Sequence, residues 1–291
     1  VVDNGSSDGS ESAISEQYPN VTLLQTGENL GYAGGNNVGI NWALDHNADY
    51  VLLLNNDTTV APDLLTVFIH SAATLPPESV FGAKIYYFDT PDLIWYAGGR
   101  WLNYADGFEH VGKMQVDSEL FNEQIKTDYI TGCALFAKAD TFVNVGLLDE
   151  AFFLTYEETD WCYRARVKGS ECFVIPDAHV WHKVSVSFGG KFSPVRAYYM
   201  ARNKCLWVTG ENPIILSSFF KLIIFLPDRV VSLKLEIGKR KPNPLELTTI
   251  YSSTLSKLRE LWPDFCLLSS GVPGKRIMPI TFSPSENLKR L

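Results

Sequence analysis

One buried strand ends in oxygen-bearing side chains, and this feature constrains the fold most. The apolar residues 50–54 (YVLLL) are followed directly by Asn55-Asn56-Asp57. A central parallel strand delivers ligands to the edge of its sheet in this way. An Asp at such a strand end can coordinate Mg²⁺ or Mn²⁺, which take oxygen ligands and bridge to phosphates. Taken alone, the segment is equally well interpreted as an Asx turn before a helix that starts at Pro62.

The surrounding pattern alternates strands with helices, which predicts a right-handed βαβ arrangement. Strands are expected at residues 1–2, 21–25, 50–54, 80–88, 130–137 and 173–176. Helices are expected at residues 12–17, 63–75 and 139–145, at the end of a Gly-rich loop (31–39) through 42–44, and in an acidic segment that runs to Gly169. Residues 90–128 are mixed, and we expect a β-ribbon or a long loop that covers a cleft. The predicted fold class is α/β, with a mostly parallel central sheet and flanking helices.

Composition excludes some classes of function. The net charge of −8 disfavours a nucleic-acid-binding function, because such proteins carry basic surfaces. The five cysteines are widely spaced and form no C-x-x-C, which disfavours a disulfide framework or a zinc site and favours a reducing, cytoplasmic compartment. The chain shows no signal peptide and starts inside a strand, so we expect that its first strand is missing.

Two polar segments precede the strand that ends at Asp57. Asp3 lies just past a strand, where a carboxylate can accept the N–H of a pyrimidine ring or the hydroxyls of ribose; the turn chemistry of Asn4-Gly5 explains it without a function. The Gly-rich segment from Glu28 to Gly39 lets the backbone approach a ligand, and the helix that follows presents free N–H groups. Tight packing of the loop on the helix is the alternative. Because this segment comes just before the strand that leads to Asp57, we interpret it as a candidate nucleotide site.

An acidic segment follows later in the chain. Glu157, Glu158 and Asp160 crowd the expected start of a helix, where the helix dipole favours acids, and Asp160 can pair with Arg164 at i,i+4. That structural explanation does not account for adjacent acids that directly follow a stretch rich in aromatic residues. A carboxylate against an apolar wall has a raised pKa, which suits a general base.

One histidine and several aromatic residues complete the candidates. His182 follows an apolar strand, and a lone histidine there is more often only hydrogen-bonded than a ligand. Asp57 supplies one side chain, however, and a divalent ion benefits from a second protein ligand. Trp181, Trp161 and Tyr156 are equally well explained as an acceptor platform and as core packing.

Taken in order, these motifs resemble glycosyltransferase family 2, most of all its bacterial rhamnosyltransferase-like and galactofuranosyltransferase-like members. The resemblance covers residues 1 to about 210 and runs through the segments 3–9, 28–37, 54–57, 132, 148–160, 182 and 202–203. It implies a GT-A fold, a nucleoside-diphosphate sugar donor, Mn²⁺ or Mg²⁺, and inversion at the anomeric carbon. The acceptor it implies is a glycan or a lipid-linked glycan in cell-surface polysaccharide synthesis, and rhamnose from a deoxythymidine-diphosphate donor is the leading analogy.

The resemblance also assigns roles by position. Glu158 matches the catalytic base, with Asp160 as the runner-up, and Asp57 and His182 match the metal ligands. Asn55 replaces the first acid of the family's D-x-D segment. The donor-binding residues are Asp3, Asn29, Gly31, Asn36, Asn55, Asn56 and Asp57. The acceptor-side residues are Gly132, Tyr156, Glu157, Trp181 and Arg202.

Two domains are expected: a GT-A domain at residues 1–210 and a C-terminal helical extension at 211–291. The apolar segment 214–226 is shorter than the roughly 20 residues of a membrane-spanning helix. It is interpreted as a packed amphipathic helix or, because basic residues follow it, as a contact with an anionic membrane surface on the inner face of the plasma membrane. Two other functions stay open: a nucleotidyltransferase that makes a sugar nucleotide, and a catalytically inactive protein that binds carbohydrate or nucleotide.

Overall fold

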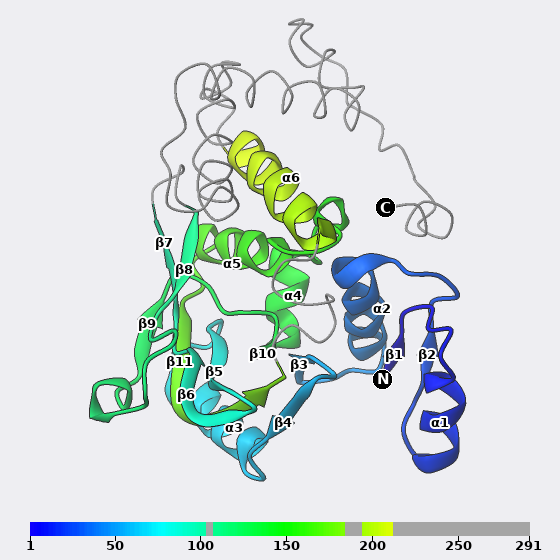
Figure 1. Ribbon diagram of the computed structural model, residues 1–291, viewed down its shortest axis with the longest axis horizontal. Helices are drawn as coiled ribbons and strands as arrows, with labels where there is room; N and C mark the ends of the chain where they lie inside the picture. Colours follow the sequence, from blue (N-terminus) through cyan, green and yellow to red (C-terminus); the bar gives the residue numbers. More distant parts are fainter. Residues whose placement is uncertain (103–106, 184–193, 212–291) are drawn as a thin grey trace, which may run out of the picture. The chain divides into compact units, whose positions relative to one another are not determined.

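The computed structural model describes residues 1–102, 107–183 and 194–211, which belong to one compact unit that ends at Glu211 (Figure 1). The predicted extension at 211–291, with its apolar segment 214–226, lies outside the described residues apart from Glu211. The domain boundary and the membrane contact therefore stay predictions. Within the described ranges, no helix combines the length and the apolar character needed to cross a membrane.

The centre of the unit is a seven-stranded sheet. Its main path runs in the order β3-β10-β5-β11-β4, with β6 beside β5 and β9 beside β11. The strands are β3 (Tyr50–Leu54), β4 (Thr58–Val60), β5 (Val80–Tyr87), β6 (Thr90–Tyr96), β9 (Ile125–Thr127), β10 (Ala134–Lys138) and β11 (Cys172–His182). Only β5 and β11 pair in parallel in this sheet; its other pairings are antiparallel.

The expected α/β architecture is confirmed, but the expectation of a mostly parallel sheet is wrong. After β6 the chain makes a long excursion and returns through β10, which inserts antiparallel between β3 and β5. The periodicity of apolar residues along one strand does not show the direction of the neighbouring strands. The antiparallel direction of β10 follows from the long connection after β6, and no local sequence pattern describes that connection.

Strand β11 is much longer than the predicted 173–176 and carries its last residues to the sheet edge. Its first part pairs with β5 up to Ile175, and the register shifts before His179. Pro176 lies at this irregularity, where a residue without an N–H is tolerated. Beyond it, β11 pairs with β4, so that His182 lies opposite Thr58.

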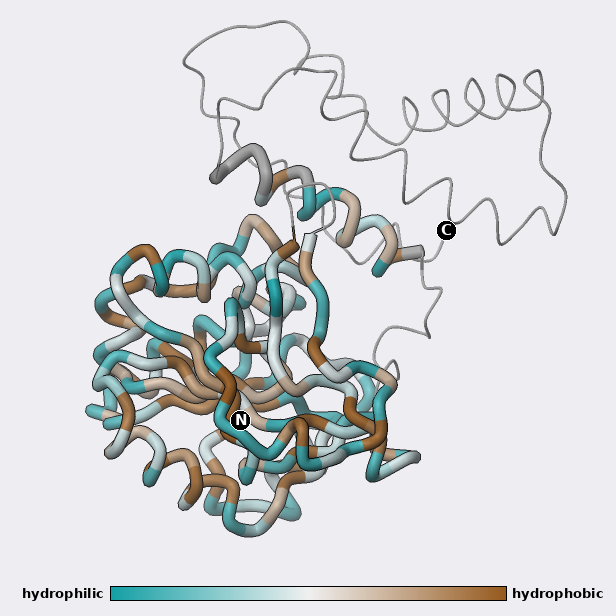
Figure 2. Tube along the Cα trace, turned by 90° about the vertical axis from the view of Figure 1, so that its left-hand side faces the viewer, coloured by the Kyte–Doolittle hydropathy of each residue, from teal (hydrophilic) through white to brown (hydrophobic). Residues whose placement is uncertain are grey.

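Helices cover both sides of the sheet. α3 (Leu64–Thr74) packs through Phe68, whose ring stacks on Phe136 of β10 with centroids 5.0 Å apart. In Figure 1, α4 (Ala139–Val145) and α5 (Glu157–Val167) lie on the other side from α3. There Trp161 stacks on Phe142 at 4.6 Å and is fully buried. Apolar segments alternate with polar ones along the chain (Figure 2), and the buried core includes apolar residues of β3, β5, β10 and β11, as expected where burial of apolar surface stabilises the fold.

The N-terminal part forms a second, two-stranded parallel sheet. It consists of β1 (Val2–Asp3) and β2 (Leu24–Gln25), joined by α1 (Ser10–Gln17) and followed by α2 (Gly31–Asp45). The Gly-rich segment is therefore a helix, and the prediction of a loop from Gly31 to Gly39 is wrong. A Cβ at Gly35 would come within 3.0 Å of Asn4, and one at Gly39 within 3.1 Å of Val2. These glycines let α2 approach β1 closely.

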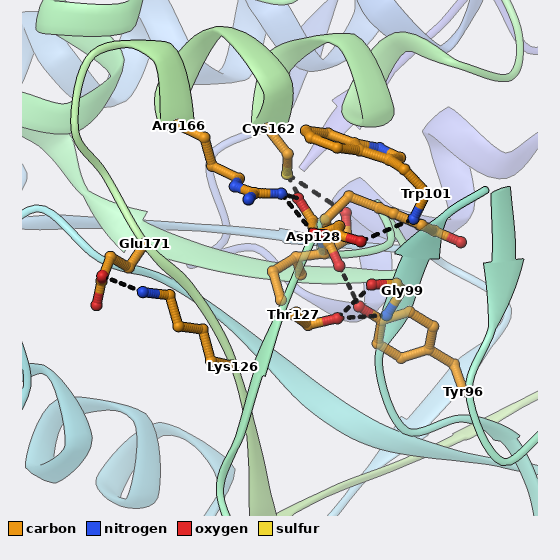
Figure 3. A network of polar contacts seen from close by, with 11 residues as sticks. Tyr96, Gly99, Trp101, Lys126, Thr127, Asp128, Cys162, Arg166 and Glu171 are labelled. Atoms are coloured by element: carbon orange, nitrogen blue, oxygen red, sulfur yellow. Dashed lines mark hydrogen bonds and ion pairs between the residues drawn. The ribbon is translucent and has the colours of Figure 1, made fainter. Parts of the chain in front are cut away.

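A small ribbon extends from the main sheet, and its described residues are 97–102 and 107–128. It contains β7 (Gly99–Trp101), β8 (Phe108–His110) and a 3-10 turn, η1 (Glu119–Phe121). Figure 3 shows its anchor: the Gly99 N–H donates to Thr127 Oγ1 at 2.6 Å, and the Trp101 N–H donates to Asp128 Oδ2 at 2.9 Å. Arg166 of α5 donates to Asp128 Oδ1 at 2.6 Å and lies over the Trp101 ring. These contacts fix the predicted ribbon against α5.

Candidate active site

Asp57 and His182 lie in contact. Asp57 precedes β4 and His182 ends β11, and the antiparallel pairing of these strands joins the two residues. His182 Nε2 lies 3.1 Å from Asp57 Oδ1, with the side chains 9% and 15% exposed respectively. The backbone closes the same corner, because the Lys183 N–H donates to the Asp57 carbonyl at 2.9 Å. The structure thus meets the geometric condition for a shared ion.

The electrostatics of this pair suit a cation. Burial lowers the pKa of His182, against the opposite effect of Asp57, so the imidazole is neutral at pH 7 and Nε2 can donate its proton to Asp57 or ligate a metal. An imidazole nitrogen and a carboxylate oxygen 3.1 Å apart could together hold one divalent ion.

Two features limit such a site. His182 Nδ1 has no hydrogen-bond partner among the described residues, whereas a metal-ligating histidine usually donates from its second nitrogen. Within the same residues, no group of three or more His, Cys, Asp or Glu side chains could hold an ion. The chain therefore offers two ligands here, and donor phosphate oxygens or water would complete the coordination.

Glu158 lies in the first turn of α5. Burial raises the pKa of Glu158, while hydrogen bonds from the backbone N–H groups of Glu158, Gly132 and Thr159 oppose that rise. Gly132 is held in turn by Tyr32, whose hydroxyl donates to the Gly132 carbonyl at 2.6 Å. A Cβ at Gly132 would lie 2.4 Å from the Tyr32 hydroxyl oxygen, so the position requires glycine. The structure brings Glu158 and Gly132 together, as the predicted site requires.

The segment of Gly132 and Cys133 links Glu158 to the end of β3. The Gly132 N–H donates to the Glu158 carboxylate, and burial, followed by the charges of Asp57 and Glu158, raises the pKa of the Cys133 thiol. The Asn55 N–H also donates to the Cys133 carbonyl at 3.1 Å. The possible metal ligands and the possible base therefore face one small region at the end of β3 and the start of β10.

The predicted donor residues fall into two groups. Asn55 is half-buried and Asn56 is exposed beside Asp57. Asp3 is buried and accepts from the Ser6 N–H at 3.3 Å, and the Asn36 amide donates to the Tyr32 carbonyl. All these residues lie at the ends of β1, β3 and the start of α2. Their donor-binding roles remain predictions.

The first N–H groups of α2 are not free, contrary to expectation. The Gly31 N–H donates to Asn29 Oδ1 at 2.9 Å, and the Tyr32 N–H donates to the Phe153 carbonyl at 2.6 Å. The protein itself thus occupies the first donors of this helix. Asn29 and Gly31 shape the segment rather than leaving an anion site open.

The predicted acceptor platform is wrong for two of its aromatic residues. Trp161 is 0% exposed and Tyr156 is 3% exposed, so core packing explains both. Trp181 points to the face of β11 opposite to His182, because side chains alternate along a strand. It stacks on Tyr86 with centroids 5.8 Å apart. The structure does not bring Trp181 to the Asp57–His182 pair.

Three further predicted residues have structural contacts. Glu157 is 3% exposed, so it offers no surface to an acceptor. Asp160 forms the expected i,i+4 ion pair, with Arg164 Nε 2.8 Å from its Oδ2, which disfavours it as the base. Arg202 of α6 (Pro194–Glu211) donates to the Ala151 carbonyl at 2.7 Å. Its acceptor-side role stays a prediction.

Sequence reasoning missed three residues near the site. Tyr32 lies in the Gly-rich segment and could have been chosen as its one hydroxyl-bearing side chain. The Trp95 ring lies edge-on to the His182 ring at 4.7 Å and to the His110 ring at 4.7 Å. Burial, with a smaller contribution from Lys113, lowers the pKa of His110 to about 3, so its ring is neutral. Trp95 and His110 come from the mixed region 90–128, where no motif marked them.

Comparison with known proteins gives the family. Residues 1–140 match the model of Glycosyl transferase family 2. The low-salt glycan biosynthesis hexosyltransferase Agl10 of Haloferax volcanii is 30% identical over 190 residues, which are 62% of this chain and 57% of that protein. The dTDP-rhamnosyl transferase RfbF of Shigella flexneri is 24% identical, over 68% of this chain and 66% of its own.

A third relative and one solved structure extend the comparison. The N-acetylglucosaminyl-diphospho-decaprenol L-rhamnosyltransferase of Mycobacterium tuberculosis is 26% identical, over 65% of this chain and 67% of its own. This chain thus spans between 57% and 67% of the lengths of these relatives. The crystal structure of GalNAc-T7 with UDP, GalNAc and Mn²⁺ matches 62% of this chain and 36% of its own, with a TM-score of 0.50 and 14% identity. The first 140 residues thus match glycosyl transferase family 2, and the described domain has the GT-A fold.

Proposed function

We propose that this protein transfers a sugar, rhamnose or another hexose, from a nucleoside-diphosphate sugar to a hydroxyl of a glycan or lipid-linked glycan, with inversion at the anomeric carbon. One observation carries the proposal. The Asp57–His182 pair, at 3.1 Å, follows Asn55, whose N–H donates to the Cys133 carbonyl, and the Glu158 carboxylate accepts from the Gly132 N–H. The proposed leaving-group site and the proposed base thus adjoin the same short stretch of backbone.

The relatives support this class of reaction. Their names describe a hexosyltransferase and two rhamnosyltransferases, one of them named for a dTDP-linked donor. The family match favours glycosyl transfer over a nucleotidyltransferase. Sugar class, acceptor and linkage are part of the proposal, because the chain matches only part of each relative.

On the donor side, Asp57 and His182 would hold Mn²⁺ or Mg²⁺ together with the donor diphosphate. Such an ion neutralises the charge that develops on the departing nucleoside diphosphate. Asp3 and Asn55 would orient the nucleoside, with Asn55 as a neutral donor and acceptor. The neutral state of His182 suits this task, because a protonated imidazole has no lone pair on Nε2 for a metal.

On the acceptor side, Glu158 would act as the general base. Its carboxylate takes the proton of the acceptor hydroxyl, whose oxygen forms the new bond to the anomeric carbon. The bond from that carbon to the diphosphate oxygen breaks on the opposite face, and the nucleoside diphosphate leaves with the bonding electrons. Burial raises the pKa of Glu158, which makes its carboxylate a stronger base.

The test is a panel of nucleoside-diphosphate sugars with the full chain. We expect release of nucleoside diphosphate that requires Mn²⁺ or Mg²⁺, an acceptor hydroxyl, and a matching donor sugar. Asp57→Ala and His182→Ala should each weaken metal-dependent nucleotide binding, measured by calorimetry. Glu16→Gln, at an exposed acid on α1, is the control for the loss of a charge elsewhere.

Three results would contradict the proposal or part of it. Metal-dependent nucleotide binding without transfer or hydrolysis of any donor would favour the inactive binding protein. Release of pyrophosphate from a nucleoside triphosphate and a sugar phosphate would favour the nucleotidyltransferase. Unchanged nucleotide binding in both Asp57→Ala and His182→Ala would remove the metal pair from the mechanism.

A further inference from the structure

The chain adopts an unfavourable backbone conformation just before Glu158. Between the 3-10 turn η2 (Glu150–Phe152) and α5, three residues with side chains have positive φ: Phe153 (55°), Thr155 (68°) and Tyr156 (75°). Each left-handed residue other than glycine costs about 1–2 kcal/mol. A β-branched residue such as Thr155 is rare in this region. Such a loop, here residues 153–156, persists only where its surroundings hold it.

One side chain of α6 holds much of this loop. The amide nitrogen Nδ2 of Asn203 lies 2.6 Å from the carbonyl oxygen of Phe152, 2.7 Å from that of Leu154 and 2.8 Å from that of Thr155. Its two hydrogens therefore serve three carbonyl groups. Asn203 is 0% exposed, so in the folded protein these carbonyl groups are served by the amide and not by bulk water.

The amide of Asn203 is itself oriented by its neighbour. Arg202 Nη1 donates to Asn203 Oδ1 at 2.6 Å and to the Ala151 carbonyl at 2.7 Å. This contact fixes the amide oxygen and directs Nδ2 toward the loop. On the other side, the Tyr32 N–H of α2 donates to the Phe153 carbonyl at 2.6 Å. The loop is thus fixed between α2 and α6.

We propose that Asn203 is a positioning residue for the transfer reaction, an inference that rests on the proposed role of Glu158. Loop 153–156 leads directly into Glu157 and Glu158, and its conformation sets where α5 begins. Asn203 contacts none of Asp57, His182 and Glu158 in the bonds described, and acts on Glu158 through the backbone. Its removal lets the loop leave the left-handed region and shifts the carboxylate away from Gly132.

The first test compares kcat with donor binding in Asn203→Ala. A displacement of about 1 Å in a reacting group can lower the rate about 10²-fold. We therefore expect kcat to fall by about 10²-fold, while the KM for the donor and the calorimetric Kd for nucleotide change less than about 2-fold. The Asp57–His182 pair is held by the backbone pairing of β4 and β11, in which α6 takes no part. A purely structural residue would weaken both properties together.

The second test is rescue of the loop by glycine. Thr155→Gly removes the steric cost of the positive φ, so the loop should keep its conformation without Asn203. In the Asn203→Ala background, Thr155→Gly should restore most of the lost kcat. Thr155→Ala is the matched control: it also removes the buried hydroxyl but keeps a Cβ at φ 68°, and it should restore little.

Hydrogen exchange keeps the inference testable if Asn203→Ala is too unstable for kinetics. Asn203→Ser retains one donor, and deuterium uptake should rise in residues 152–158 without rising in β3. Wild-type kcat in both Asn203 variants, or equal rescue by Thr155→Gly and Thr155→Ala, would overturn the inference. If Glu158→Gln is inactive in that case, the proposed function survives. If Glu158→Gln turns over normally, the role of the base fails instead.

Discussion

The two halves of the candidate site are built in different ways. Asp57 and His182 are carried by strands β4 and β11, whose backbone pairing brings the two side chains to 3.1 Å. Glu158 follows a loop with three positive-φ residues that long-range contacts from α2 and α6 hold in place. Strand pairing holds the first half, and a few side-chain and backbone bonds hold the second.

This difference teaches where changes should matter. A ligand at the end of a paired strand keeps its position when distant helices shift, because backbone hydrogen bonds fix it on both sides. A base behind an unfavourable loop is displaced as soon as one of its supports is lost. We therefore expect the acceptor half to be sensitive to residues that never touch a substrate, and the donor half to be sensitive mainly to its own ligands.

The largest expected effect comes from the proposed base itself. Glu158→Gln keeps the shape of the side chain but cannot take a proton, so kcat should fall by about 10²–10⁴-fold while nucleotide binding persists. Asp160→Asn is the matched comparison. It breaks the ion pair with Arg164, which should cost about 1–3 kcal/mol of stability and leave kcat largely unchanged. Measured kcat and chemical unfolding distinguish them, and the reverse pattern would move the base to Asp160.

A smaller effect should follow from closing the contact between α2 and the loop. Gly31 has φ 75°, and a Cβ there would lie 2.4 Å from the Phe153 carbonyl oxygen. Gly27 has φ 77° but nothing within 4 Å of the added carbon. Both Gly→Ala changes should cost about 1–2 kcal/mol for the backbone, and only Gly31→Ala should also lower kcat by displacing the loop. Equal kcat values in the two variants would show that the loop does not depend on α2.

The smallest effect is a pH-dependent change in stability at Glu157. Burial, and then the charge of Glu158, raise the pKa of Glu157 well above its usual value in the folded protein. The stability from its protonated form is present below the unfolded pKa and is lost as pH rises through the folded one. Glu157→Gln cannot ionise, so its melting temperature should exceed that of the wild type above the folded pKa, and the gain should vanish at low pH.

The measurement is a series of melting curves across pH, with Glu16→Gln to correct for the loss of one charge. An unpaired buried polar atom costs about 1–3 kcal/mol, and Glu157 Oε2 has no hydrogen-bond partner within the described part of the chain. A gain that did not depend on pH would mean that ionisation of Glu157 is not the cause.

Much of the fold was predictable because burial leaves a local signature. The apolar run of β3, the helical spacing of Leu64 and Phe68 in α3, and Gly146 after α4 all located elements close to their observed bounds. The Gly-rich segment was predicted wrongly. Glycine normally disfavours helix, but close packing on β1 outweighs that local preference in α2.

Sequence alone determined which residue types stand at the ends of the elements, because strand ends and helix starts expose polar side chains in recognisable patterns. It placed Asp57 after a buried strand and three acids at the start of a helix. Only the tertiary structure decided that Asp57 meets His182 and that Glu158 faces Gly132. These outcomes depend on strand pairing and on contacts between residues far apart in the chain, which no local pattern encodes.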